Sequence, residues 1–155
     1  MASSAARRVF MQRSTAFQSE KETPMDGLIT VPSSYGPKET MDRLETDVRA
    51  KGMHVFVRID HAAGASSAGL DLRPTEVLLF GNPQAGTKLM QQTQTIGLEL
   101  PLKVIVWQDA SGKTWLGYDE PRWLAMRFGI AEQMTAVTDA MTSGLAAFAT
   151  HATGS

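Results

Sequence analysis

The sequence predicts an α+β fold: a single domain with an open, largely antiparallel five-stranded sheet and helices packed on one face. Five short apolar runs are typical of strands, and amphipathic runs of helical period lie between and after them. Their order, strand–helix–strand–strand–helix–strand–strand–helix–helix, fits two layers. A chain of 155 residues that is 43% hydrophobic and 20% charged is typical of one soluble globular domain.

Residues 1–24 differ in composition from the rest of the chain. Arg7, Arg8 and Arg13 stand among Ser, Ala and Thr, and no acidic residue comes before Glu20. This composition resembles a mitochondrial transit peptide, but it is also common in disordered termini. We expect a disordered N-terminal extension, with Met25 as a possible true start, and a domain that covers residues 25–155.

The first elements are a strand and a helix. Residues 28–32 form a short apolar run, and Pro37 opens a helix that ends at Gly52. Met41, Leu44 and Val48 fall on one face of this helix, while charged residues cover the other.

The second predicted strand, 53–61, alternates between two faces. One face continues an apolar row to a histidine: Val55, Val57, Ile59 and His61. The other face carries Phe56, Arg58 and Asp60. In a regular strand Asp60 and His61 therefore point in opposite directions, so we do not expect an acid–base pair unless the strand ends between them. We expect His61 at the rim of the core, and residues 62–69 to form a short helix or a turn.

The most distinctive stretch runs from Thr75 to Met90. An unbroken apolar strand stops at Gly81, which would permit backbone angles closed to other residues. Asn82 is a good helix N-cap and Pro83 a good first helical residue. Plain capping explains Asn82 and Pro83 without any function and is the default interpretation. The functional alternative is that the free N–H groups of that helix start face an anion.

The same stretch comes close to the phosphate-binding loop GxxxxGK[ST]. Gly81 and Gly86 have the right spacing, but Thr87 precedes Lys88. The reversed order rotates both side chains by about 100° around a helix, so neither points where a nucleotide needs it. We therefore do not expect nucleotide hydrolysis.

Residues 102–109 and 113–119 predict a β-hairpin around a turn that ends with Gly112. The register pairs Asp109 with Lys113 and Trp107 with Trp115. The opposite face carries Val104, Val106, Leu116 and Tyr118. Because both faces are apolar, the Trp face needs a cover: a partner subunit, a ligand or the C-terminal helix.

Two helices are predicted after the hairpin. Asp119 or Glu120 caps the first, which has Pro121 near its start and ends at Gly129. The second, 131–150, is amphipathic, with a stripe of Ile130, Met134, Val137, Met141, Leu145 and Phe148. Gly144 costs roughly 1 kcal/mol against alanine there, so we expect the last turns to fray.

Composition limits the partners. A net charge of −1 gives no footprint for nucleic acid. The chain has no cysteine, and its three histidines lack ligand spacing, so we expect no metal and no cofactor. No apolar run approaches the ~20 residues of a membrane span. We expect a cytoplasmic protein without a membrane partner.

Five segments cover nearly all of residues 27–130: GLITVPSSY (27–35), KGMHVFVRIDHAAGA (51–65), GLDLRPTEVLLFGNPQAGTKLM (69–90), LELPLKVIVWQD (98–109) and YDEPRWLAMRFGI (118–130). They resemble the bacterial and archaeal family named domain of unknown function 302, and the run FGNPxxGTxLM followed by LPLK is specific to it. The resemblance implies an open sheet with helices packed against it, often dimeric, and no known reaction, substrate or cofactor. It also implies signature positions at Asp60, His61, Phe80, Gly81, Asn82, Pro83, Gly86, Thr87, Lys103 and Tyr118.

The leading functional hypothesis is a non-catalytic module that binds a small molecule or anion, or regulates a partner, as a homodimer. Its candidate polar lining is His61, Asn82, Thr87, Lys103 and Tyr118. One alternative is an enzyme that uses His61 as general base with Lys103 or Tyr118 as electrostatic partner. Another is a structural interaction domain that docks a partner on the Trp face. We assign no catalytic residue.

Overall fold

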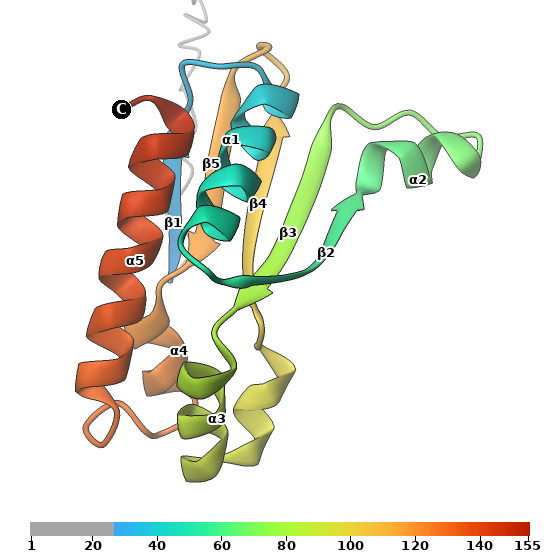
Figure 1. Cartoon of the computed structure of the whole chain (residues 1–155). Helices are drawn as coiled ribbons and strands as arrows, with labels where there is room; N and C mark the ends of the chain where they lie inside the picture. Colours follow the sequence, from blue (N-terminus) through green and yellow to red (C-terminus); the bar gives the residue numbers. More distant parts are fainter. Residues whose placement is uncertain (1–26) are drawn as a thin grey trace, which may run out of the picture.

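The computed structural model describes residues 27–155; the expected extension 1–24 lies outside the described residues. The elements in chain order are β1 (Leu28–Pro32), α1 (Pro37–Ala50), β2 (His54–Asp60), α2 (His61–Ser67), β3 (Thr75–Gly81), α3 (Pro83–Gln92), the 3-10 helix η1 (Gln94–Leu98), β4 (Leu102–Gln108), β5 (Thr114–Asp119), α4 (Pro121–Arg127) and α5 (Thr135–Thr153) (Figure 1).

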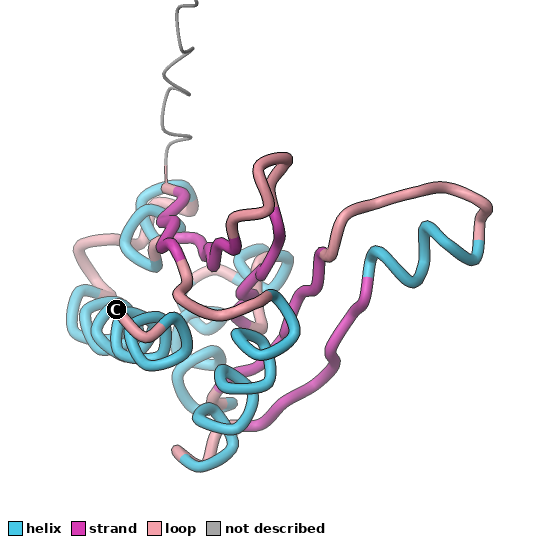
Figure 2. Tube along the Cα trace, turned by 90° about the horizontal axis from the view of Figure 1, so that it is seen from above, coloured by secondary structure: helices cyan, strands magenta, loops and turns pink. Residues whose placement is uncertain are grey.

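The strands form one five-stranded sheet in the order β1-β5-β4-β3-β2. Every neighbouring pair is antiparallel. Helices α1 and α5 lie on one face of the sheet, while α3, η1 and α4 gather at one of its ends (Figure 1). Helix α2 extends outward from the far end of β2 and β3, which is clearest from above (Figure 2). The predicted α+β fold is therefore confirmed.

The core lies between the sheet and the two long helices. Strand alternation turns one set of side chains towards α1 and α5: Leu78, Phe80, Val104, Val106, Leu116 and Tyr118. Helix α1 contributes Met41, Leu44 and Val48, each fully buried as predicted. From α5, Phe148 meets Phe80 edge to face, with ring centroids 5.8 Å apart. Burial of one such side chain stabilises the fold by about 1.5–3 kcal/mol.

Short-range signals place most element ends where the sequence predicts them. The side chain of Glu120 caps α4 by accepting the Trp123 N–H at 3.0 Å. Gly129 follows α4 with a φ of 72°, in the left-handed region that favours glycine. In the β4–β5 hairpin, Trp107 pairs with Trp115, and the Asp109 N–H donates to the Lys113 carbonyl at 2.9 Å.

The expected fraying of α5 is wrong. The helix continues through Gly144 to Thr153, and Ala152 and Thr153 are fully buried. The Thr153 carbonyl also accepts the Ser34 N–H at 2.9 Å, which fixes the last turn to the segment before α1. Tertiary packing therefore outweighs the local cost of the glycine.

The predicted alternation of β2 is also wrong, because the strand contains a bulge. Val55 pairs with Phe80 and Val57 with Leu79, so Phe56 is an extra residue. Beyond it the faces are reversed: Val57 and Ile59 are 42% and 38% exposed on the side away from the helices.

The reversal turns Arg58 towards α1. Its guanidinium contacts Glu76 at 2.8 Å, Asp42 at 2.7 Å and Glu45 at 3.2 Å. The hydrogen bonds that Arg58 donates to Glu76 first, and then to Asp42 and Glu45, raise the pKa of Arg58 above its already high ordinary value. The cluster joins α1 to the outer edge of the sheet.

Candidate ligand-binding cavity at the β3–α3 junction

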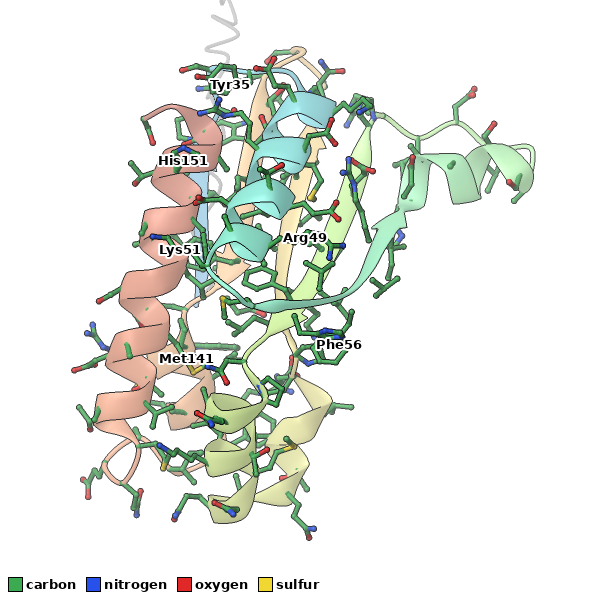
Figure 3. All side chains as sticks on the ribbon, in the orientation of Figure 1. Tyr35, Arg49, Lys51, Phe56, Met141 and His151 are labelled. Atoms are coloured by element: carbon green, nitrogen blue, oxygen red, sulfur yellow. The ribbon has the colours of Figure 1, made fainter. Side chains whose placement is uncertain are left out.

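A cavity of about 270 Å³ lies where β3 passes into α3. Its walls come from the start of β2, the β3–α3 junction, the start of β4 and the side of α5. They consist of Met53, Phe56, Gly81, Asn82, Pro83, Ala85, Gly86, Thr87, Met90, Leu100, Pro101, Leu102 and Met141. Phe56 and Met141 lie at the same level of the molecule, on opposite sides of the junction (Figure 3).

The junction is built by local sequence signals. Asn82 Oδ1 accepts the Gln84 N–H at 2.9 Å, and Pro83 is the first residue of α3, so the predicted cap is confirmed. The expectation for Gly81 is wrong, because its φ is not positive. An added Cβ there would lie 3.6 Å from Pro101 Cβ, an ordinary contact. Gly81 therefore needs no special backbone angle.

Gly86 keeps the cavity open from within α3. An added Cβ at this position would meet only Leu100 Cδ1, at 3.8 Å. Glycine in a helix interior is less favourable than alanine by roughly 0.5–1 kcal/mol. The position thus costs helix stability and leaves space between α3 and the start of β4.

The lining that residues 27–155 provide is apolar apart from Asn82 and Thr87, and no side chain in it titrates. Three methionines, at 53, 90 and 141, contribute flexible and polarizable walls. Such an interior favours a mostly apolar ligand, oriented by the amide and the hydroxyl.

Of the predicted site residues, His61 lies far from this cavity. It is the exposed first residue of α2, not the end of a strand. Its neighbour Asp60 pairs with Glu76, whereas the cavity begins at Gly81, which pairs with His54. Five residues of an extended strand separate the two ends of β3 by about 17 Å.

Lys103 and Tyr118 lie outside the cavity lining as well. Lys103 stands opposite Leu79 on the face away from the helices, with Nζ 3.4 Å from Glu99 Oε2. Tyr118 is only 6% exposed and belongs to the core on the other face. Burial first, and the charge of Glu120 second, raise the pKa of its phenol.

The five candidate residues therefore do not form one site, because strand alternation and strand length separate them. The structure keeps Asn82 and Thr87 together. The sequence did not predict the apolar walls of the cavity, above all Met53, Phe56 and Met141. One sequence feature did point to the cavity: the two family-specific segments FGNPxxGT and LPL both contribute to its lining. Nothing local to Phe56 or Met141 indicates their place.

A second candidate surface is the sheet face turned away from α1 and α5, which we call the open face. It carries Val57, Ile59, Val77, Leu79, Ile105, Trp107 and Trp115. The two tryptophan rings stack with centroids 6.3 Å apart and planes at 17°. Because α5 packs on the opposite face, the C-terminal helix is excluded as the cover of the Trp face.

Neighbouring residues of the hairpin fix both tryptophan rings. The Trp115 indole N–H donates to Asp109 at 2.8 Å, and Lys113 Nζ lies 4.4 Å from the centre of the Trp115 ring. A Cβ on Gly117 would come within 3.1 Å of Trp107, so glycine lets that ring lie close against the sheet.

Neither a metal cluster nor a membrane span is found in the part of the chain that the structure describes. Between residues 27 and 155, no three His, Cys, Asp or Glu side chains gather as ligands. No helix in that range is long and apolar enough to cross a membrane.

The sequence and the fold are both similar to those of known proteins. The sequence matches the family described as Domain of unknown function DUF302 over residues 29–148, which extends beyond the resemblance at 27–130 into α5. The crystal structure of an uncharacterised conserved DUF302 protein from Bacillus stearothermophilus is similar, with a TM-score of 0.73 and 26% sequence identity. The alignment covers 83% of this chain and 99% of that one.

Curated relatives include proteins named Fluoride-specific ion channel FluC 1 in Brucella suis and Brucella abortus. Each is 45% identical over 128 residues, or 83% of this chain. The match covers 50% of the first relative and 47% of the second. The chain therefore spans about half the length of these relatives.

Proposed function

This chain belongs to the DUF302 family, and we propose that it is a non-catalytic module that binds a small molecule in the β3–α3 cavity. The observation that supports the proposal is the cavity itself, which has a volume of about 270 Å³, apolar walls and two polar residues, Asn82 and Thr87, in its lining. A largely apolar pocket with a few placed polar groups is the usual form of a small-molecule site.

The cavity supports binding over the enzyme alternative. General acid–base catalysis needs a side chain that exchanges a proton within reach of the substrate. Neither the Asn82 amide nor the Thr87 hydroxyl does so near neutral pH, and His61 lies near the opposite end of β3. Absence of a charged lining residue also favours a neutral or mostly apolar ligand over a small inorganic anion.

The test is a thermal-shift screen of the full chain against a metabolite library. A ligand at 100 times its Kd should stabilise the native state by about 2.7 kcal/mol. Gly86→Leu should fill the cavity and abolish that shift, without lowering the Tm of the free protein. Gly64→Leu is the matched control, because Gly64 is an exposed helical glycine in α2 with open space around it. Equal shifts in both variants would place the ligand elsewhere.

We further propose that the module works as a homodimer through the open face. The support is the amount of apolar surface there, beyond what a solvated sheet face usually carries. Light scattering should give about twice the chain mass of 16.8 kDa. Ile59→Lys should shift the mass to the monomer.

Ile29→Lys is the matched control for the dimer. Ile29 is 37% exposed and Ile59 is 38% exposed, but Ile29 pairs with Tyr118 on the helix side of β1. A wild-type monomer at micromolar concentration, or equal effects of the two substitutions, would contradict the proposed interface.

A second candidate function follows from the Brucella relatives, which are named fluoride-specific ion channels and of which the match covers about half. We propose that the domain accompanies a fluoride channel, on its cytoplasmic side, as a regulatory partner. Removal of the matching half from the Brucella suis relative should change the rate of fluoride efflux from liposomes. An unchanged rate would count against this role.

A further inference from the structure

A second chamber adjoins the β3–α3 cavity. It has a volume of about 470 Å³ and lies between α3 and α5. The two chambers have five lining residues in common: Met53, Asn82, Ala85, Leu102 and Met141. The two chambers are therefore adjacent, and together we call them the α3–α5 groove.

The groove is long and narrow. Along α5 its lining runs from Ala136 to Phe148, which corresponds to about 18 Å of helix axis. Ala136, Ala140 and Gly144 recur every fourth residue on that wall, so small side chains line its length. A Cβ on Gly144 would meet nothing within 4 Å. The buried rings of Phe80 and Phe148 belong to the same lining.

The walls suit a flexible chain better than a rigid ring. Met53 and Met141 stand where the two chambers meet, and Met90 lines the inner one. Unbranched methionine side chains adapt to a ligand of irregular path. An aliphatic chain that occupies both chambers can adapt its path to their shape at low cost.

The rim of the groove is positively charged. Among the described residues, Lys88 is the one charged side chain that lines the outer chamber, and it is exposed. No carboxylate forms an ion pair with Lys88 among residues 27–155. Within the described part of the chain, no acidic side chain lines either chamber. The charge therefore complements an anionic end group beside Lys88, above an apolar interior.

We propose that the α3–α5 groove binds a single-chain amphipathic anion of the fatty-acid class. The carboxylate lies beside Lys88, and the aliphatic chain runs through the outer chamber into the β3–α3 cavity. This inference rests on the proposed binding function and names its ligand class.

Titration calorimetry on the full chain, with monomeric ligands, tests the proposal. Laurate should bind one to one and at least tenfold more tightly than octanoate, since each buried CH₂ contributes to affinity. It should also bind more tightly than dodecanol, and far more tightly than dodecyltrimethylammonium. Lys88→Gln should weaken laurate about tenfold and leave dodecanol unchanged. Lys51→Gln, an exposed lysine just after α1, should change neither.

Substitutions of glycine residues test where the aliphatic chain of the ligand lies. Gly144→Leu should abolish laurate binding while the Tm of the free protein stays the same or rises, because a helical glycine is replaced by a better helix former. Gly64→Leu should keep the binding. Equal affinities for laurate and dodecyltrimethylammonium, or laurate binding that survives Gly144→Leu, would overturn the assignment.

Different results would overturn the fatty-acid ligand and the proposed small-molecule binding. A library ligand that is lost in Gly86→Leu but retained in Gly144→Leu would overturn the fatty-acid class and leave the binding function standing. Laurate binding that is insensitive to both variants would overturn the groove as its site.

Discussion

Replacement of Arg58 by methionine tests the reversed orientation of β2 beyond its bulge. Arg58 donates to Glu76 from two nitrogens, at 3.1 and 2.8 Å. It also donates to Asp42 at 2.7 Å and to Glu45 at 3.2 Å. Methionine keeps much of the aliphatic packing but removes the cation that Glu76, Asp42 and Glu45 share, so that only Lys38 and Arg49 still pair with Asp42 and Glu45.

The loss of folding stability in Arg58→Met should lie between that for breaking an exposed ion pair and that for breaking a buried one. Arg58 and Glu76 side chains are 23% and 19% exposed. Exposed pairs contribute about 0.2–1 kcal/mol, whereas breaking a buried pair costs about 3–5 kcal/mol, so we expect about 2–3 kcal/mol. With an unfolding entropy of about 2.1 cal/mol/K per residue over the 155 residues, the Tm should fall by about 6–9 °C.

Thermal and urea unfolding at pH 7 measure this loss. Arg49→Met is the control, because Arg49 pairs with Glu45 from a side chain that is 58% exposed. Its cost should stay below about 1 kcal/mol. If Arg58→Met loses no more than the control, Arg58 does not face α1, and the bulge does not reverse the strand.

The same variant should change the response to acid. Hydrogen bonds from Lys38 first and Arg58 second lower the pKa of Asp42, and bonds from Arg49 first, then Arg58, lower that of Glu45. A carboxylate with a lowered folded pKa stabilises the fold above its unfolded pKa, near 4, and loses that contribution as pH falls through the folded value. The stability difference between wild type and Arg58→Met should therefore narrow between pH 7 and pH 3. A constant difference would contradict this origin.

Three further predictions concern the junction, the hairpin and the N-terminus. Asn82→Ala should cost about 0.5–2 kcal/mol in urea unfolding, because the cap to the Gln84 N–H at 2.9 Å is lost; no cost would mean that the cap is not used. The Trp115 indole first, and a serine hydroxyl second, hold the pKa of Asp109 well below its usual range, so Trp115 fluorescence should change only well below pH 4. In Asp109→Asn that acid transition should disappear. Removal of residues 1–24 should move the Tm by less than about 2 °C, and a larger fall would show that they contribute to stability.

The sequence by itself determined the features that depend on near neighbours. Asn82 and Pro83 start a helix because a cap needs only the N–H two residues ahead. Trp107 meets Trp115 because a short hairpin turn fixes its own register. The two-layer architecture followed from the order and periodicity of the apolar runs, and the family from five short segments.

Only the tertiary structure decided which residues meet. The bulge at Phe56 arises where β2 pairs with β3, and one extra residue reverses every side chain beyond it, since the period of a strand is two. Because of that reversal, the Arg58 side chain faces α1 and the Ile59 side chain lies on the open face. Likewise, Met53, Gly86 and Met141 line one groove although they lie far apart in the chain. No local pattern encodes such a meeting, because it depends on how α3 and α5 settle against the end of the sheet.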